Sequence, residues 1–312
     1  MKLLANGKIN LGLNVAGKRE DGFHELDMVM QSLELADEIE IERIGRKGVL
    51  SESDSERGNY GISIKLSGKF SEGIPEDGRN LAYKAAESLL REFSIKEDLS
   101  IHLIKNIPFG AGLGGGSADA AAVLRGVNKL FSLGLDFEGL RKRAEALGSD
   151  VPFCIRGGTC RVRGRGEIFT DIEPTWAGRT ILLAKPQKHA STGKIYGAFD
   201  ELPEKDRVHP DMEGVVRSLE NGDDAGLSKY LDNSLEKVTL ALIPEIGVLK
   251  ALLKETGAIG SLMSGSGSTV FGIFSDIDPA EKARDRILQG WSQRHDGKLA
   301  LIITKSCGRI DE

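Results

Sequence analysis

The spacing of apolar residues predicts several strands in the first half of the chain. Residues 9–15 alternate polar and apolar side chains, as a half-buried strand does, and residues 28–42 predict one or two more strands. Residues 99–104 form another apolar run of strand length. Residues 45–79 are rich in glycine, serine and charge, so we expect an exposed excursion that contains a short strand at residues 61–66.

The same half contains stretches with helical periodicity. Asn80 is a typical N-cap residue, and it precedes a helix that we predict to about Phe93. A second amphipathic helix is predicted to begin at Ser117, with a buried stripe formed by Val123, Leu124, Val127, Leu130 and Phe131. Residues 137–147 predict a third helix, which should stop at Gly148. Residues 159–169 are typical of a strand or a hairpin.

The pattern breaks around residues 173–175 and restarts as a strand at Thr180. We therefore predict two domains, over residues 1–173 and 174–312. Helices and strands follow without the regular repeat of a doubly wound sheet, which favours an α+β architecture. The predicted helices cover about 211–219, 223–231, 244–256 and 279–291, and the predicted strands about 258–263, 269–274 and 299–304.

Length and composition exclude several classes of protein. A chain of 312 residues is long for one core, and its 40% hydrophobic and 29% charged residues are ordinary for a globular protein. The net charge of -5 does not favour binding to nucleic acid or to an acidic membrane. The chain has no apolar run of about 18 residues, and its polar start does not resemble a signal peptide. We expect a cytoplasmic enzyme or binding protein.

The cysteines do not indicate a disulfide framework or a zinc site. Cys154, Cys160 and Cys307 are odd in number and form no CxxC pair. We therefore expect free thiols, as in a reducing compartment.

The first candidate for a functional site is the segment at residues 110–116, where five glycines occupy seven positions. Glycine permits a positive φ and leaves no Cβ between the backbone and a ligand, so consecutive N–H groups can turn toward one phosphate group. The helix predicted to follow would add its free N–H groups and the positive end of its dipole. This segment therefore predicts a phosphate-binding loop.

Two familiar nucleotide motifs fit this loop incompletely. Gly110 to Gly115 satisfy GxGxxG, but the second strand and acidic residue of a dinucleotide-binding unit do not follow. The P-loop pattern also fits, except that Gly116 stands where the lysine should be. A cation must therefore come from another segment. A second glycine cluster, at residues 263–269, is either a plain hairpin turn or a support that packs behind the first loop and closes the site.

Three segments together resemble the motifs of the GHMP kinases, the group that includes galactokinase, homoserine kinase, mevalonate kinase and phosphomevalonate kinase. They are residues 7–11, 108–118 and 262–269. The segments KREDGFHEL at residues 18–26 and GSDVPF at residues 148–153 are similar to the branch whose acceptor is 4-diphosphocytidyl-2-C-methyl-D-erythritol. The resemblance implies an N-terminal α/β domain like ribosomal protein S5, a C-terminal ferredoxin-like α+β domain, and an active site between them.

The resemblance also implies the reaction, a phosphorylation of the acceptor's 2-hydroxyl that uses ATP and Mg²⁺ in the non-mevalonate route to isoprenoid precursors. Asn80, Leu81 and Lys105 match positions near the nucleoside of ATP. Ser117 is a candidate both for the helix cap and for an indirect Mg²⁺ contact. The ATP phosphates would lie against Pro108, Phe109, Gly110, Ala111, Gly112, Leu113, Gly114, Gly115, Gly116, Ser117 and Ala118, supported by Gly265, Ser266 and Gly267.

Two residues match the catalytic positions of the family. Asp150 would accept the hydroxyl proton, and Lys8 would supply the positive charge that the glycine loop lacks. Gly7 precedes Lys8 where an alanine is usual, a difference that we expect to loosen this end of the strand.

The acceptor would be recognised by a second group of residues. Phe23 and His24 match the pair that reads cytosine, although a tyrosine is usual in place of Phe23. Asn10, Thr192 and Tyr196 match positions in the acceptor pocket. We expect the ring of Phe23 to stack on the base, with Tyr196 as a candidate for the opposite face.

Three other functions remain open from the sequence. Another GHMP kinase, of the homoserine or mevalonate type, would keep Asp150 but would have no cytosine to read. A nucleotide-binding regulator on the same fold would not need Lys8 and Asp150, and an NAD enzyme would account for GxGxxG alone. We expect a monomer or a weak homodimer.

Overall fold

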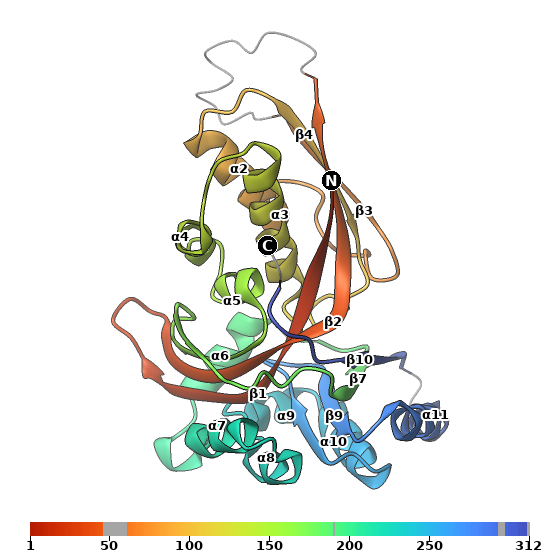
Figure 1. Cartoon of the computed structure of the whole chain (residues 1–312). Coiled ribbons are helices and arrows are strands. Elements are labelled where there is room, and N and C mark those ends of the chain that lie inside the picture. Colours follow the sequence, from red (N-terminus) through yellow and green to blue (C-terminus); the bar gives the residue numbers. More distant parts are fainter. Residues whose placement is uncertain (46–60, 190, 293–296, 311–312) are drawn as a thin grey trace.

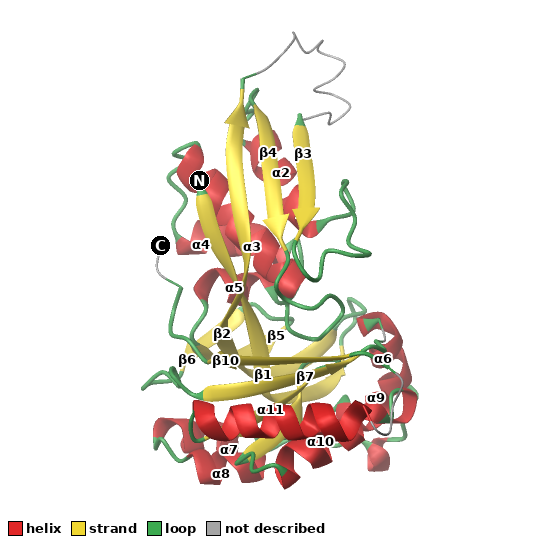
Figure 2. Ribbon diagram, turned by 90° about the vertical axis from the view of Figure 1, so that its right-hand side faces the viewer, coloured by secondary structure: helices red, strands yellow, loops and turns green. Residues whose placement is uncertain are grey.

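The computed structural model describes residues 1–45, 61–189, 191–292 and 297–310, which form two sheets with helices packed on them (Figures 1 and 2). The first sheet has six strands and the second has four. Figure 1 shows the long strands β1 and β2 running from the N-terminal part of the molecule down to the second sheet. The two halves of the chain are therefore connected by strands as well as by the linking segment.

The first sheet is built around β2 (His24–Ile44), which pairs with β1 (Lys2–Lys18) along one edge. Its other edge pairs first with β5 and then with β4, both antiparallel, while β3 adds to β4 in parallel and β6 to β5. The remaining strands are β3 (Ile62–Ser67), β4 (Asp98–Ile104), β5 (Thr159–Gly164) and β6 (Ile168–Asp171). The helices of this half are α2 (Leu81–Glu92), α3 (Gly115–Leu130), α4 (Phe137–Glu145) and α5 (Val151–Arg156).

The second sheet is antiparallel, in the order β10-β7-β9-β8. Figure 2 shows α10 and α11 side by side across its outer face. Its strands are β7 (Thr180–Pro186), β8 (Gly260–Met263), β9 (Val270–Phe274) and β10 (Leu299–Lys305). The helical elements of this half are α6 (Thr192–Asp200), η1 (Glu204–Asp206), α7 (Met212–Glu220), α8 (Asp224–Tyr230), α9 (Glu236–Leu242), α10 (Glu245–Glu255) and α11 (Ile277–Ser292).

Most strands and helices expected from periodicity are confirmed, and the differences concern the ends of some elements and three helices that were not expected. Residues 28–42 belong to one strand, β2, and Asn80 caps α2 through its side chain. The cap expected at Ser117 is wrong, because α3 begins at Gly115 and its N-cap is Gly114, with a φ of 70°. Glycine adopts this left-handed conformation without the steric cost of a Cβ, so the helix starts inside the glycine loop. The pattern missed α5, α6 and α9.

The two halves share apolar contacts where β1 and β2 meet the second sheet. Ile9 and Leu11 of β1 are fully buried and belong to one cluster with Leu183 and Phe271 of the second sheet. This packing fixes the middle of β1, the part of the strand that carries Lys8. The division predicted after residue 173 falls between β6 and β7 and remains a proposal.

Candidate active site

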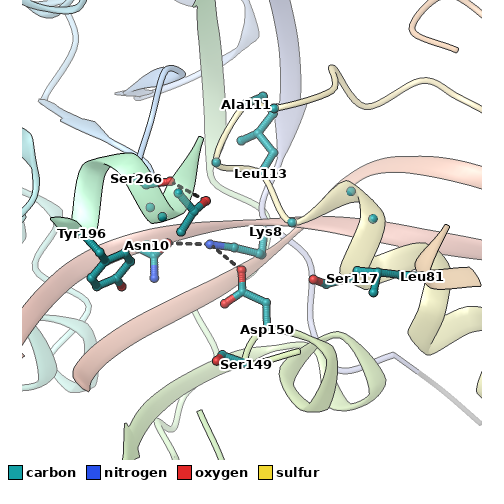
Figure 3. A pocket seen from close by; sticks show the side chains of 18 of the residues that line it. Lys8, Asn10, Leu81, Ala111, Leu113, Ser117, Ser149, Asp150, Tyr196 and Ser266 are labelled. Carbon is teal, nitrogen blue, oxygen red and sulfur yellow. Dashed lines mark hydrogen bonds and ion pairs between the residues drawn. The ribbon is translucent and has the colours of Figure 1, made fainter. Parts of the chain in front are cut away.

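A pocket of about 840 Å³ lies between the glycine loop, β1, α5 and α6 (Figure 3). Nearly all the site residues predicted from the sequence line it. The exceptions are Ala118, which is buried in α3, and Gly267, which lies behind the pocket against Met263. This volume is at the upper end of what is typical for small-molecule sites, so two substrates fit better than one.

Lys8 and Asp150 meet at the centre of the pocket. The Lys8 side chain is 4% exposed, and its Nζ lies 3.2 Å from Oδ2 of Asp150. The same Nζ donates to Oδ1 of Asn10 at 2.8 Å, and Figure 3 shows both contacts as dashed lines. Residues two apart on a strand share a face, which is why Lys8 and Asn10 both enter the pocket. A buried ammonium with two oxygen partners is held in one place.

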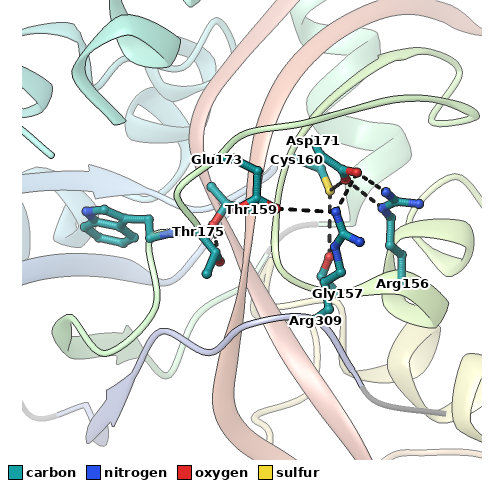
Figure 4. Close-up of polar contacts among 9 residues, drawn as sticks. Arg156, Gly157, Thr159, Cys160, Asp171, Glu173, Thr175 and Arg309 are labelled. Atoms are coloured by element: carbon teal, nitrogen blue, oxygen red, sulfur yellow. Dashed lines mark hydrogen bonds and ion pairs between the residues drawn. The ribbon is translucent and has the colours of Figure 1, made fainter. Parts of the chain in front are cut away.

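Asp150 is presented by the start of α5. It occupies the N-cap position, but its side chain makes no hydrogen bond to the helix, so the carboxylate is available to Lys8. The other end of α5 is anchored, because Nε of Arg156 donates to Oδ1 of Asp171 at 2.8 Å. Arg309 from the C-terminal segment donates to Oδ2 of Asp171 at 2.7 Å (Figure 4). The hydrogen bond from Arg156 keeps the pKa of the Asp171 carboxyl below its usual value, so this anchor stays ionised.

The glycine loop presents backbone toward the pocket. Gly110, Gly112 and Gly114 have φ values of 62°, 75° and 70°, so alternate residues adopt the left-handed conformation that glycine permits. The N–H of Lys8 donates to the carbonyl of Leu113 at 2.9 Å, which ties the loop to β1. A Cβ at Gly114 would lie 2.9 Å from Cγ of Lys8. The absence of side chains here therefore lets the loop approach the buried lysine.

The second glycine cluster packs directly behind the first. Oγ of Ser264 donates to the carbonyl of Gly112 at 2.9 Å, and the N–H of Thr269 donates to the carbonyl of Ala111 at 3.1 Å. Nδ2 of the buried Asn233 donates to the carbonyls of Met263 and Gly265 at 3.0 and 2.8 Å. The two loops therefore contact each other, and the cluster is more than an isolated hairpin turn.

Lys105 lines the pocket, but its ammonium is bound to two carboxylates. Its Nζ contacts Asp37 and Asp119, and all three side chains are buried. Oδ1 of Asp37 accepts the N–H groups of Asn106 and Ile107 at 2.6 and 2.8 Å. Burial raises the pKa of Asp119 to about 7, against the opposing effect of Lys105. This network fixes the chain where it enters the glycine loop and again where α3 leaves it.

The opposite wall of the pocket carries aromatic rings. The Tyr196 ring lies 4.6 Å from the His24 ring between centroids. Burial raises the pKa of Tyr196, so its hydroxyl stays neutral. Phe23 is 47% exposed, and the guanidinium carbon of Arg165 lies 3.7 Å from its ring centroid. Oγ1 of Thr192 is 3.1 Å from Oγ of Ser266, which links α6 to the second glycine loop.

Sequence reasoning missed several residues of the pocket. Lys18, Arg165 and Asp200 line the pocket, as do Ser149 and Arg79. Asp200 had a detectable signal, because it follows Thr192 and Tyr196 at intervals of four residues and so shares their face of a helix. That signal required α6 to be predicted first. Lys18 and Ser149 lie in the motif segments at residues 18–26 and 148–153, but nothing in those motifs marks them as pocket residues. Arg79 and Arg165 carry no pattern that separates them from ordinary surface charges.

The described ranges contain neither a cluster of metal-binding side chains nor a membrane-spanning helix. No group of three or more histidine, cysteine, aspartate or glutamate side chains in them could hold a metal ion. No helix in those ranges is long and apolar enough to cross a lipid bilayer. Cys154, Cys160 and Cys307 are free thiols.

Comparison with family models identifies both halves of the chain. The model of the GHMP kinases N terminal domain matches residues 80–158. The model of the GHMP kinases C terminal matches residues 215–293. The two-domain α+β fold expected from the motifs is therefore confirmed.

Similar sequences indicate which branch of the GHMP kinases the chain resembles. A 4-diphosphocytidyl-2-C-methyl-D-erythritol kinase of Geobacillus sp. (strain WCH70) is 44% identical over 280 residues, and the match covers 88% of each chain. The protein of the same name from Caldicellulosiruptor saccharolyticus is 42% identical over 287 residues, or 92% of each chain.

Solved structures agree with the sequence comparison. The crystal structure of a 4-(cytidine 5'-diphospho)-2C-methyl-D-erythritol kinase matches with a TM-score of 0.75 and 32% identity, over 99% of this chain and 100% of that chain. The homoserine kinase from Cytophaga hutchinsonii matches with a TM-score of 0.72 over 98% of this chain and 97% of its own, but at 19% identity it shows a shared fold alone. From its motifs, fold and relatives, this chain belongs to the 4-diphosphocytidyl-2-C-methyl-D-erythritol kinases of the GHMP kinase family.

Proposed function

We propose that the protein transfers the γ-phosphoryl group of ATP to the 2-hydroxyl of 4-diphosphocytidyl-2-C-methyl-D-erythritol, giving the 2-phosphate and ADP. In the cell this step would serve the non-mevalonate route to isoprenoid precursors. The observation that carries the proposal is the contact of 3.2 Å between Lys8 and Asp150 in a pocket with a glycine loop on one side and aromatic rings on the other. Relatives that are 42–44% identical over most of the chain bear this enzyme's name.

In this mechanism Asp150 is the general base. Phosphoryl transfer requires an acceptor hydroxyl held in line with the transferred group and stabilisation of the charge that develops on it. The Asp150 carboxylate is 30% exposed on the pocket side and makes no bond to its own helix, so it can accept the hydroxyl proton. The ammonium of Lys8 would stabilise the negative charge on the oxygens that take part in the transfer.

The donor would occupy the glycine-loop side. We assign the ATP phosphates to the backbone of residues 108–118 and the N-terminus of α3, because free N–H groups at a helix start favour anions. The nucleoside would lie near Asn80 and Leu81 at the start of α2. Lys105 would act by fixing the loop, since its ammonium already has two carboxylate partners.

The residues present are compatible with Mg²⁺. Magnesium in kinases is held largely by phosphate oxygens and water, so it needs few protein ligands. Ser117 lines the pocket in the first turn of α3 and is the residue that we propose to contact the ion indirectly. When bound, the ion would neutralise charge on the ATP phosphates.

The acceptor would bind against the aromatic wall. We propose that Phe23 and Tyr196 provide faces for the cytosine ring, with His24 beside them, and that Asn10 and Thr192 line the same part of the pocket. Phe23 retains the aromatic face of the usual tyrosine and lacks its hydroxyl, so we expect stacking without a polar contact from this residue.

We also propose that the protein works in the cytoplasm as a monomer or a weak homodimer, with domains divided after residue 173. Three free thiols are typical of a reducing compartment. Sedimentation at several protein concentrations would measure the oligomeric state. Expression of residues 1–173 and 174–312 as separate chains would test whether each folds alone.

The closest alternative is a GHMP kinase that acts on homoserine or mevalonate. A coupled assay for ADP release distinguishes the two, with each acceptor supplied in turn at equal concentration. We expect ADP release with 4-diphosphocytidyl-2-C-methyl-D-erythritol and none above background with the unmodified polyol, homoserine or mevalonate. Equal turnover of the polyol with and without its cytidine diphosphate group would exclude the proposed acceptor.

A further inference from the structure

Asp200, at the last position of α6, joins the two halves of the chain at the acceptor wall of the pocket. Its Oδ1 lies 2.7 Å from Nε2 of His24, and its Oδ2 lies 2.7 Å from Nζ of Lys18. Both partners belong to the β1-β2 pair, where Lys18 and His24 stand directly opposite each other. The carboxylate of Asp200 therefore connects the last residue of β1 and the first residue of β2 to α6.

This bridge lies beside the aromatic residues of the wall. The His24 side chain is 12% exposed and that of Asp200 is 26% exposed, and both line the pocket. The ring of Tyr196, one helical turn before Asp200, lies at 34° to the His24 ring. The position of His24 is thus determined from two sides by α6, through a ring contact and through a hydrogen bond.

The charges around Asp200 favour its ionised form. Partial burial acts to raise the pKa of its carboxyl, but the hydrogen bonds from His24 and Lys18 outweigh this and lower the pKa below its usual value. The C-terminal end of α6 has separate support, because Nη2 of Arg207 donates to the backbone carbonyl of Asp200 at 3.0 Å. Removal of the Asp200 side chain therefore leaves the end of the helix anchored.

We propose that Asp200 is a positioning residue for the nucleotide part of the acceptor, which acts by holding His24 and Lys18 in place before the acceptor binds. This inference rests on the proposed function. A bridge of this kind reduces the side-chain freedom that binding would otherwise have to remove. A partly exposed ion pair contributes little to stability by itself, so its expected effect is on binding.

The experiment measures binding of CDP by titration calorimetry and the steady-state kinetics of both substrates. In Asp200→Ala we expect the Kd for CDP and the KM for the acceptor to rise about tenfold. The KM for ATP and kcat should stay within about twofold, because the glycine loop is unchanged. Glu201→Ala is the matched control, since Glu201 is the next residue and is exposed.

A double-mutant cycle separates positioning from a general structural effect. If Asp200 acts through His24, then Asp200→Ala should weaken CDP binding far less in a His24→Ala background than in the wild type. Asp200→Asn retains the shape and one acceptor oxygen but not the charge, and we expect an intermediate Kd. If the alanine variant does not fold, the Kd of Asp200→Asn for CDP is used in its place.

Three results would overturn the inference. The first is wild-type affinity for CDP in both Asp200 variants. The second is an equal loss of CDP affinity on Asp200→Ala in the wild-type and the His24→Ala backgrounds. The third is a rise in the KM for ATP as large as the rise in the KM for the acceptor. Failure of the wild-type protein to bind CDP at all would instead refute the proposed function. The two failures are thus distinguished by the wild-type titration.

Discussion

The two walls of the pocket are built in different ways. The glycine-loop wall comes mainly from one continuous segment, residues 107–117, and its glycines leave the backbone accessible. The acceptor wall is assembled from the β1-β2 pair and α6, and it presents aromatic and charged side chains. Every ATP-dependent kinase must bind the same phosphates, for which backbone is sufficient, whereas recognition of one acceptor requires particular side chains.

The walls also differ in how their charges are balanced. On the donor wall, Lys105 is fully enclosed with Asp37 and Asp119, so its charge serves to fix the backbone. On the acceptor wall, Lys18 and Asp200 remain partly exposed to the pocket. Lys8 and Asp150 lie between the walls, where the two substrates would meet.

The largest effect is expected at the junction of the walls. Asp150→Asn removes the proton acceptor but keeps the size of the side chain, so kcat should fall by about 10²–10⁴-fold. Binding of ATP and CDP should stay close to wild type, because neither wall is altered. Steady-state kinetics and calorimetry of the same preparation measure both quantities. Full turnover by this variant would exclude Asp150 as the base.

The donor wall could be predicted from the sequence much better than the acceptor wall. The glycine loop, and the helix capped by Asn80, depend on residues that are adjacent in the chain, so local conformational rules suffice. The cap at Ser117 was mispredicted because a glycine in a left-handed conformation started the helix earlier. Even on the donor wall, the enclosure of Lys105 by Asp37 required the fold, since 68 positions separate these two residues.

The acceptor wall required the three-dimensional structure. Its helix α6 was not predicted, because the segment TGKIYGAFD contains two glycines and its buried residues are Ile195 and Phe199 alone. The partners His24 and Asp200 are 176 positions apart, and no periodicity connects them. The resemblance to a known family supplied His24 and Tyr196 but not the carboxylate of Asp200, which contacts His24.

A second prediction compares the same substitution on the two walls. Gly112 has a φ of 75°, and a Cβ there would lie 2.2 Å from the carbonyl oxygen of Ser264. Gly112→Ala should therefore lower the free energy of unfolding by at least about 1–2 kcal/mol. It should also raise the KM for ATP by about tenfold or more, because the two glycine loops must separate.

The matched control lies on the acceptor wall. Gly193 in α6 has nothing within 4 Å of an added Cβ, and alanine favours a helix. Gly193→Ala should leave the free energy of unfolding unchanged or raise it by up to about 1 kcal/mol. Chemical denaturation of the two variants gives the comparison. Equal destabilisation by both would show that the contact between the glycine loops is not the cause.

A third prediction concerns stacking on the acceptor wall. Phe23→Ala removes an exposed aromatic face and should raise the Kd for CDP roughly two- to tenfold, with the KM for ATP unchanged. Phe23→Tyr keeps the face and should stay within about twofold of the wild type. A large gain from the tyrosine variant would instead indicate that its hydroxyl makes a polar contact that this chain lacks.

The smallest expected effect is on the pH dependence of the free energy of unfolding, and it comes from the buried Asp119 of the donor wall. Burial raises the pKa of Asp119 to about 7 in the folded protein, above its value in the unfolded chain. The folded state therefore binds the proton more tightly, and the stability gained from it is lost as the pH rises through 7. The free energy of unfolding should fall by about 1 kcal/mol between about pH 6 and about pH 8 from this group. Asp119→Asn should remove this fall, and parallel curves for the variant and the wild type would contradict the assignment.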